Sequence, residues 1–378
     1  MYCADCETVD EYFFETTWFW LFVPTVESFG KVAGLCGSMG LESKQETTHC
    51  ISTLVKLEQV SEFLTSLNGT LEGPELAGTK VTTTARAQSP SLDDIGRMTT
   101  LEILLNRYKS KWLIQSVEKE RYQTWFQPIV EAPGCLDDAR VFAYEGLFRI
   151  LDENSTIVPP DLAFSLAEQS DLLFSLDLVA RRSAVESAAK AGLTGKLFIN
   201  FNPSSIYDPS YCLRATAASI NEIGLTPQDV VFEITETHKA NNINHLKGIL
   251  SFYRSAGFQV ALDDIGSGWS GLNLLQSLRP DYVKIDMDLV RDIDLDSYKQ
   301  NIVTNLINIA KLNSIQVIAE GVETEAEARW LINAKADFLQ GFLFAKPKPM
   351  GEMVCDNQAM RIEQSMNPLK DAARNNGY

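Results

Sequence analysis

Histidine is scarce in this chain, whose 378 residues include only His49, His238 and His245. None of them stands at the end of a strand-like run, so zinc-hydrolase motifs and a Ser-His-Asp triad find little support. Long apolar runs are missing as well, because the run from Trp18 to Pro24 is far shorter than the roughly 20 residues of a membrane helix. No basic stretch precedes that run, and we therefore expect neither a signal peptide nor a membrane span.

Positive charge is also in short supply, since 33 lysines and arginines face 50 aspartates and glutamates and the net charge is −17. This acidity disfavours nucleic-acid polymers and anionic membrane surfaces as partners. It does not exclude a small phosphodiester substrate, because bound cations would reverse the local sign. An apolar content of 45% with 22% charged residues is ordinary for a soluble globular protein, and we expect a cytoplasmic location.

The cysteines are odd in number and irregular in spacing, which is not the pattern of a disulfide framework. They are Cys3, Cys6, Cys36, Cys50, Cys135, Cys212 and Cys355. Cys3 and Cys6 have the spacing of a metal or redox site, to which His49 and Cys50 could add ligands, but a second close pair is missing. A structural zinc or iron site there stays open beside the alternative that these cysteines are small apolar residues.

What the chain has instead is a series of seven strand-like apolar runs that end in polar residues. They are VFAYEGLFR (Glu145), LFINFN (Asn200), VVFEITE (Glu233, Glu236), VALDDIGSG (Asp263, Asp264), YVKID (Lys284), VIAEGVE (Glu320, Glu323) and FLQGF (Gln340). Helix-sized stretches separate the runs, which indicates repeated βα units. A (β/α)8 barrel collects the carboxyl ends of its strands at one face, so the pattern predicts an active site in such a barrel.

The residue types indicate the chemistry of that site. Carboxylates and an amide without histidine or cysteine suit Mg²⁺ or Mn²⁺ rather than zinc. The adjacent pair Asp263 and Asp264 can serve two cations, and two cations favour phosphoryl transfer, while Lys284 can orient a water or stabilise a phosphate. Taken singly, Glu145 is more simply a cap, Lys284 with Asp286 an ion pair, and Asn200 a turn residue. Their occurrence on successive strands favours an active site.

In these motifs the sequence resembles the EAL-domain cyclic di-GMP phosphodiesterases of bacteria, over roughly residues 120 to 350. The family's motifs appear in order as Glu145-Gly146-Leu147-Phe148-Arg149, Asn200-Phe201-Asn202-Pro203, Glu233-Ile234-Thr235-Glu236, Asp263-Asp264-Ile265-Gly266-Ser267-Gly268, Val283-Lys284-Ile285-Asp286, Ala319-Glu320-Gly321-Val322-Glu323 and Gln340-Gly341-Phe342. The departures are Gly146 for Ala, Phe148 for Leu, Ile265 for Phe and Ser267 for Thr. None of them removes a chemical group or a loop glycine.

The resemblance implies two cations per active site, Mg²⁺ or Mn²⁺, with Ca²⁺ expected to inhibit. It implies that the first cation is held by Glu145, Asn200, Glu233 and Asp263. The second would share Asp263 and add Asp264 and Glu320.

The resemblance also implies catalytic and substrate-binding roles. Glu320 resembles the general base, Lys284 the lysine that contacts the attacking water, and Glu236 the residue that pins the loop carrying the two aspartates. Substrate binding is expected from Arg149, Asp286, Glu323 and Gln340, the last by supporting the water bound by the cations.

We therefore expect hydrolysis of cyclic di-GMP to the linear dinucleotide 5'-pGpG, by a homodimer formed through the EAL domain. Two alternatives stay open: a catalytically weak or inactive domain that binds cyclic di-GMP as a receptor, and one that serves only as a protein-interaction module. The metal ligands and the lysine are all present, which favours the enzyme.

The fold expected is α/β, with a TIM-like (β/α)8 barrel over residues 123–350, and the resemblance implies that its first strand, Trp125–Val130, runs antiparallel to the rest. The longest helices are expected at Phe164–Ser187 and Asp288–Leu312. Residues 351–378 are expected to form a helix, Met353–Met366, and a frayed tail.

Residues 1–85 read as a small α/β domain, ferredoxin-like or another fold typical of sensory modules, with no recognised family. Its expected strands and helices are Trp18–Pro24, Val26–Met39, Thr47–Val55, Leu57–Leu67 and Thr79–Ala85. Residues 86–122 are expected to form a linker and a connecting helix, Leu101–Tyr122, because apolar residues recur there at helical spacing. This helix could be a packing strut or could transmit a signal.

Overall fold

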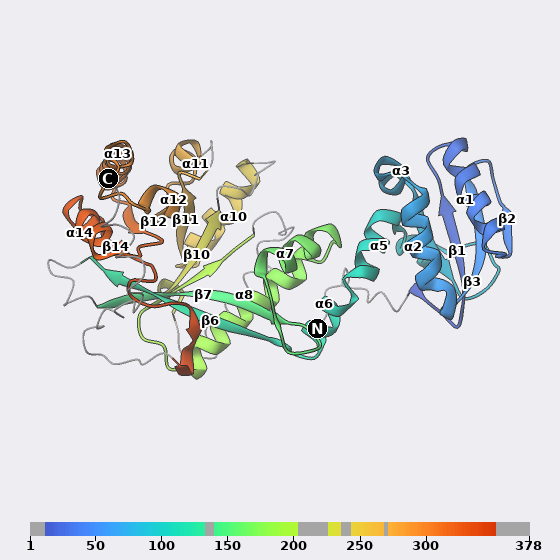
Figure 1. Ribbon diagram of the computed structural model, residues 1–378, viewed down its shortest axis with the longest axis horizontal. Coiled ribbons are helices and arrows are strands. Elements are labelled where there is room, and N and C mark those ends of the chain that lie inside the picture. The colour runs from blue at the N-terminus through green and yellow to red at the C-terminus, as the bar shows by residue number, and fades with distance from the viewer. Residues whose placement is uncertain (1–11, 133–139, 203–225, 236–242, 268–270, 353–378) are drawn as a thin grey trace, which may run out of the picture. The chain divides into compact units, whose positions relative to one another are not determined.

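The computed structural model describes residues 12–132, 140–202, 226–235, 243–267 and 271–352 (Figure 1). The chain forms two compact units. The first consists of residues up to 121 together with 150–176, and the second of residues 122–149 together with 177 onward. Of the helices within the described ranges, none combines the length and the apolar character that crossing a bilayer requires. The predicted helix Met353–Met366 lies outside the described residues, as do Cys3 and Cys6.

The first unit contains an antiparallel sheet with ferredoxin-like topology. Its strands are β1 (Thr16–Phe22), β2 (Ser43–Gln45), β3 (Cys50–Lys56), β4 (Lys80–Thr84) and β5 (Thr99–Thr100). Its helices are α1 (Val26–Ser38), α2 (Val60–Thr70), α3 (Gly73–Gly78), α4 (Leu92–Gly96), α5 (Leu101–Lys109), α6 (Lys111–Glu118) and α7 (Pro160–Gln169). The sheet order is β2-β3-β1-β4-β5, so β1 lies between β3 and β4, as in a βαββαβ unit.

Alternation along β1 gives this sheet a packed face. Phe19 and Leu21 are fully buried in one apolar core with residues of α1, α2 and α5. Thr25 begins α1, because its side-chain oxygen accepts a hydrogen bond from the backbone N–H of Ser28. The small N-terminal α/β region predicted from the sequence is confirmed.

Three predicted helices are wrong in one respect, since each is interrupted. The segment Leu101–Tyr122 breaks at Ser110 into α5 and α6, and three leucines of α5 lie in the core of the first unit. The segment Phe164–Ser187 breaks at Asp171 into α7 and α8 (Leu173–Lys190). The segment Asp288–Leu312 breaks at Asp292 into α12 (Met287–Val290) and α13 (Ser297–Leu312). Asp171 and Asp292 have positive φ angles, a left-handed conformation that ends a helix.

The second unit is a closed barrel of eight strands. They are β6 (Tyr122–Glu131), β7 (Val141–Leu151), β9 (Lys196–Asn200), β10 (Val230–Thr235), β11 (Gln259–Ile265), β12 (Tyr282–Ile285), β13 (Gln316–Ala319) and β14 (Phe338–Leu339). The order runs β6-β14-β13-β12-β11-β10-β9-β7, and β7 pairs with β6 to close the circle. Strand β6 is antiparallel to β14, whereas the neighbouring pairs from β7 to β14 are parallel. The TIM-like fold with an antiparallel first strand is confirmed.

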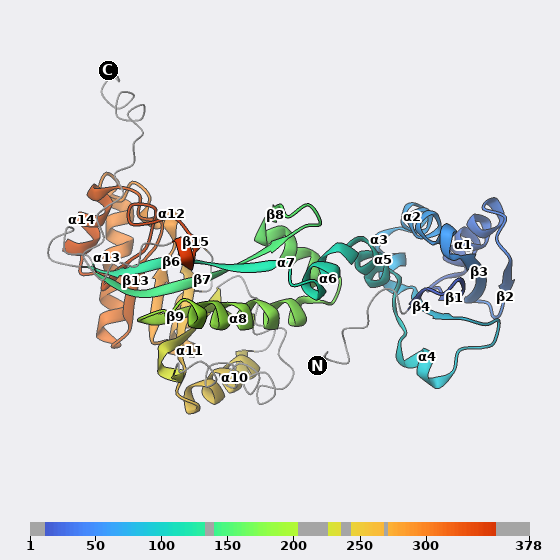
Figure 2. The same ribbon diagram turned by 90° about the horizontal axis from the view of Figure 1, so that it is seen from below.

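Helices α8, α10 (Ile243–Ser255), α11 (Gly271–Leu278), α13 and α14 (Glu325–Asn333) lie around the outside of these strands (Figure 2). Two short strands complete the set of strands in the described part of the chain. They are β8 (Ile157–Val158), which pairs with the end of β7, and β15 (Lys348–Pro349), which pairs with β6.

One layer of side chains fills the inside of the barrel, and every strand contributes one residue to it. The layer consists of Ile129, Ala143, Phe198, Val231, Ala261, Tyr282, Ile318 and Phe338, all buried. Such a layer makes the barrel interior a packed core rather than a pore. We call this layer the apolar floor, because a site at the carboxyl ends of the strands would lie directly above it.

Candidate active site

A polar layer lies directly on this apolar floor. Because side chains alternate along a strand, the residue two positions from each floor residue faces the same way. On the seven parallel strands, or directly after their last residue, these are Glu145, Asn200, Glu233, Asp263, Lys284, Glu320 and Gln340. The antiparallel strand β6 adds Gln127, which precedes Ile129 because this strand runs in the opposite direction. The structure thus brings together seven of the residues predicted from the sequence and one that the sequence reasoning missed.

Lys284 lies at the centre of the polar layer, with 1% of its side chain exposed. Its Nζ is 2.7 Å from Glu233 Oε1 and 2.7 Å from Glu320 Oε1. The same nitrogen is 3.3 Å from Asp263 Oδ1 and 3.4 Å from Glu145 Oε2. One ammonium group therefore contacts carboxylates from four different strands or strand ends.

Glu145 is held by amide side chains on its other sides. Asn200 Nδ2 donates a hydrogen bond of 3.2 Å to Glu145 Oε1, and Gln340 Nε2 donates one of 2.7 Å to Glu145 Oε2. Gln340 Nε2 is also 3.3 Å from Gln127 Oε1, and Gln127 Nε2 donates to the carbonyl of Ala345. These bonds fix which end of each amide faces the carboxylate, and they leave Gln340 Oε1 as a buried acceptor without a hydrogen-bond partner among the described residues.

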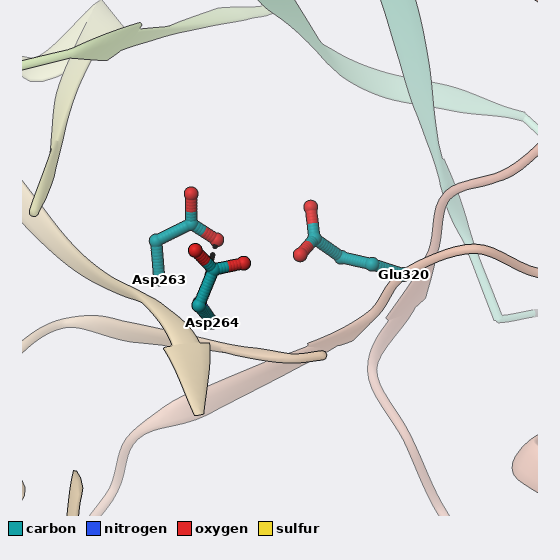
Figure 3. A group of neighbouring side chains, drawn as sticks. All are labelled: Asp263, Asp264 and Glu320. Atoms are coloured by element: carbon teal, nitrogen blue, oxygen red, sulfur yellow. Dashed lines mark hydrogen bonds between the residues drawn. The ribbon is translucent and has the colours of Figure 1, made fainter. Parts of the chain in front are cut away.

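The end of β11 turns sharply to present two carboxylates side by side. Asp264 has φ +56° and Gly266 φ +108°, and Ser267 closes the turn by donating both its N–H and its hydroxyl to the carbonyl of Asp264. The backbone N–H of Asp264 donates to Asp263 Oδ1 at 2.9 Å. Oxygen atoms of Asp263, Asp264 and Glu320 lie within 4.8 Å of one another, and Figure 3 shows their carboxylates facing the same space.

Burial of this many carboxylates shifts their proton affinities. Burial and then the charge of Glu145 raise the pKa of Glu233 well above its ordinary value. Burial also raises the pKa of Glu320, against the opposing effect of Lys284, and burial with the neighbouring Asp263 raises the pKa of Asp264 to about 6.

Glu145 and Lys284 shift in the directions expected of an ion pair. Burial acts against the charge of both groups. The pKa of Glu145 is nevertheless lowered, by Lys284 and by its hydrogen bonds, and the pKa of Lys284 is raised well above its ordinary value by the carboxylates around it. One ammonium compensates one negative charge, so the site as a whole favours additional cations.

The donors present fit hard divalent cations. They are carboxylate and amide oxygens, the ligands of Mg²⁺ and Mn²⁺, and no histidine or cysteine is among them. Glu233 Oε2 is buried without a hydrogen-bond partner among the described residues, which is a costly state for a carboxylate oxygen. A bound cation would remove that cost.

The remaining predicted residues lie apart from the polar layer or outside the described part. The guanidinium of Arg149 stacks on the Trp125 ring at 5.2 Å from its centroid, and burial lowers the pKa of Arg149. Asp286 caps α12 by accepting from the N–H of Asp288, and Glu323 pairs with Arg291. Glu236 lies outside the described residues.

Comparison with known proteins agrees with this geometry. A family model described as EAL domain matches residues 110–347. The chain is 31% identical over 262 residues to the probable cyclic di-GMP phosphodiesterase PdeG of Escherichia coli, covering 65% of this chain and 49% of that protein. It is 25% identical over 252 residues to the cyclic di-GMP phosphodiesterase PdeF of the same organism, covering 66% of this chain and 33% of that protein. The chain thus spans half or less of the length of these two relatives.

Among solved structures, the chain is similar to a standalone versatile EAL protein from Vibrio cholerae in its cyclic di-GMP-bound form. The identity is 38% and the TM-score 0.54, and the match covers 61% of this chain and 93% of that one. The residues matched by the family model, 110–347, include all eight strands of the barrel. No comparison assigns the individual residues of this chain.

Proposed function

The chain belongs to the EAL domain family, and from that premise we propose that it is a metal-dependent phosphodiesterase that hydrolyses cyclic di-GMP to linear 5'-pGpG. In this role it would lower the concentration of a second messenger in bacterial signalling. The observation that carries the proposal is the polar layer, in which every barrel strand supplies a ligand-type or catalytic side chain above an apolar floor. The names of the two relatives and the ligand of the Vibrio cholerae structure support the choice of substrate.

Two cations, Mg²⁺ or Mn²⁺, would occupy this layer. The first would take Glu145, Asn200, Glu233 and Asp263, and the second Asp263, Asp264 and Glu320. When bound, such a pair lowers the pKa of a water molecule and neutralises charge on phosphate oxygens.

The chain's own groups then have distinct tasks. Lys284 holds its positive charge beside Glu233 and Glu320, where it can orient the attacking water and stabilise negative charge on the phosphate. Glu320, whose Oε1 lies 2.7 Å from Lys284 Nζ, would take the proton from that water. Gln340 contributes its buried Oε1, an acceptor that can hold the water in place.

Substrate contacts would come from the rim around the polar layer. Arg149 can donate to a phosphate or to a guanine edge while its other face rests on Trp125. Asp286 and Glu323 would complete the rim, and Glu236 would steady the loop of the two aspartates. We propose further that the protein acts in the cytoplasm as a homodimer formed through the barrel unit, with residues 1–85 as a separate input module.

The test is incubation of the full chain with cyclic di-GMP and Mg²⁺ or Mn²⁺, followed by chromatography. A linear dinucleotide as product supports the proposal, and Lys284→Ala provides a matched variant that should form it at least ~100-fold more slowly. Bound but unchanged nucleotide would show a receptor instead. No binding at all would leave the protein-interaction module, and either result overturns the proposed activity.

A further inference from the structure

Glu327 in the first turn of α14 is a buried carboxylate, with 1% of the residue exposed, that accepts three backbone hydrogen bonds. Its Oε1 accepts from the N–H of Asp292 at 2.9 Å. Its Oε2 accepts from the N–H groups of Glu323 and Thr324, each at 2.9 Å. One side chain therefore joins two loops that are separated by α13 and β13 in the sequence.

Both loops border the candidate active site. Glu323 and Thr324 end the loop that begins with Glu320, which contacts Lys284. Asp292 follows α12, whose first residues come directly after the strand that carries Lys284. The bonds to Glu327 thus connect the segment after β12 with the segment after β13.

Two further contacts hold the same pair of segments together. Gly321, with φ +66°, packs so closely on Met287 that a Cβ there would collide with the Met287 side chain. Glu323 forms an ion pair with Arg291. The three contacts leave the loop of Glu320 little freedom to move relative to α12.

The hydrogen bonds of Glu327 exceed what a helix cap requires. The side chain of Thr324 accepts from the N–H of Glu327, and the bond from Thr324 N–H to Glu327 completes a capping box. The bonds from Glu323 and Asp292 lie outside that box. A carboxylate buried to this extent is costly unless its hydrogen bonds are made, so these two bonds tie the loops firmly to α14.

We propose that Glu327 is a positioning residue that holds the Glu320 loop in the geometry required for cation binding. It touches neither the substrate nor a cation and acts through the backbone of residues 320–324. The inference rests on the proposed function for its catalytic consequence, but its structural consequence is measurable without turnover.

The experiment compares four variants of the full chain. Glu327→Ala removes all three bonds, and Glu327→Gln keeps one acceptor oxygen but replaces the other with a donor. Thr324→Ala weakens the cap of α14 and leaves the Glu327 carboxylate in place. Glu325→Ala removes an exposed carboxylate from the same helical turn. The measurements are amide hydrogen exchange of peptides covering residues 317–324 in the metal-free protein, and Mn²⁺ affinity by calorimetry.

We expect Glu327→Ala to accelerate exchange in that peptide and to weaken Mn²⁺ binding by ~10-fold or more, the effect typical of residues that orient metal ligands. Glu327→Gln should be intermediate, and Thr324→Ala and Glu325→Ala should bind Mn²⁺ as the parent chain does. If Glu327→Ala and Thr324→Ala lower the melting temperature alike and neither changes Mn²⁺ affinity, Glu327 is only a cap and the proposal is wrong. A parent chain that binds Mn²⁺ in the expected way but hydrolyses no cyclic di-GMP would overturn the proposed activity and leave the positioning role intact.

Discussion

Lys284 Nζ lies 2.7 Å from Glu233 Oε1, and only 1% and 0% of the two side chains are exposed. The sequence left two readings of this lysine, as a catalytic group and as an ion-pair strut. The structure makes it a buried partner of four carboxylates, so removal of its charge leaves negative groups uncompensated in the barrel interior.

Lys284→Ala should therefore have two separable effects. We expect turnover to fall by ~10²–10⁴-fold, the range typical of a lost proton-transfer or water-orienting group, with cyclic di-GMP affinity nearly unchanged. In chelator the variant should lose about 3–5 kcal/mol of stability, and Mg²⁺ should restore much of it by supplying positive charge. Kinetics, nucleotide binding and melting with and without Mg²⁺ measure these effects.

The matched control is Lys311→Ala, which removes a partly exposed lysine that pairs with Asp337 outside the polar layer. A Lys284→Ala protein whose turnover is close to that of the parent chain would refute the catalytic assignment. Equal, modest losses of rate and affinity would leave only the structural role.

The sequence predicted seven of the eight residues of the polar layer because each stands at the end of a strand-like apolar run. In the structure each of the seven follows a floor residue by two positions in the chain direction. Gln127 escaped this reasoning for a physical reason. Its strand runs antiparallel, so the polar residue precedes the floor residue Ile129, and the run FQPIV ends in apolar residues rather than polar ones. The antiparallel direction expected for Trp125–Val130 already implies that a polar residue on this strand precedes the floor residue, so Gln127 could have been found from it.

The interruptions of the helices were not predictable from apolar periodicity. At Asp171 and Asp292 the apolar pattern continues across the break, but both residues adopt a left-handed backbone conformation. Asp292 donates its N–H to Glu327, 35 positions along the chain. Such a long-range contact overrides local helix propensity, and no window of neighbouring residues contains it.

Glu145→Ala should lower turnover at least ~100-fold while the barrel still folds. The variant loses a proposed cation ligand, and this loss lowers activity more than an ordinary change of packing does. Hydrogen bonds with Asn200 and Gln340 and the ion pair with Lys284 connect Glu145 to three other residues of the polar layer. The measurements are hydrolysis at saturating Mg²⁺ and circular dichroism, with the exposed Glu131→Ala as control. Near-normal hydrolysis by Glu145→Ala would show that the ligand assignment is wrong.

Metal choice provides a test that needs no variant. Mg²⁺ and Mn²⁺ should each support hydrolysis, whereas Ca²⁺ should inhibit, because its larger and more flexible coordination shell suits the compact oxygen cluster of Asp263, Asp264 and Glu320 poorly. The measurement is the rate of product formation with each ion after treatment with chelator. Full activity with Ca²⁺ alone, or in excess chelator, would contradict a two-cation mechanism.

A pH effect is expected in the first unit, at Glu75 of α3. The pKa of Glu75 is lowered to about 2, first by the hydrogen bond from the N–H of Glu72 and then by those from Lys31 and Ser28. A lowered folded-state pKa gives stability that is fully present above the unfolded-state value of 4.5 and is lost as the pH falls toward 2.

The difference in stability between the parent chain and Glu75→Gln should therefore be constant above about pH 5 and shrink below it. Amide exchange of peptides from α1 and α3 in the full chain measures it, and Glu58→Gln, at an exposed position of the same unit, serves as control. A difference that grows as the pH falls would have the wrong sign for these hydrogen bonds.

Trp125 should determine how well Arg149 binds substrate, because the guanidinium lies 5.2 Å from the centroid of the indole ring while its Nη1 donates to the carbonyl of Phe148. Cation–π contacts contribute ~0.5–2 kcal/mol depending on burial, so Trp125→Leu should raise KM for cyclic di-GMP by about 2- to 30-fold. It should leave kcat nearly unchanged, since Trp125 and Arg149 are assigned to substrate binding and not to the reacting water. Trp125→Phe keeps an aromatic face, so its KM should lie between those of the parent chain and Trp125→Leu. Steady-state kinetics of the three proteins decide the matter: a fall in kcat at constant KM would mean that Trp125 supports the barrel rather than the arginine.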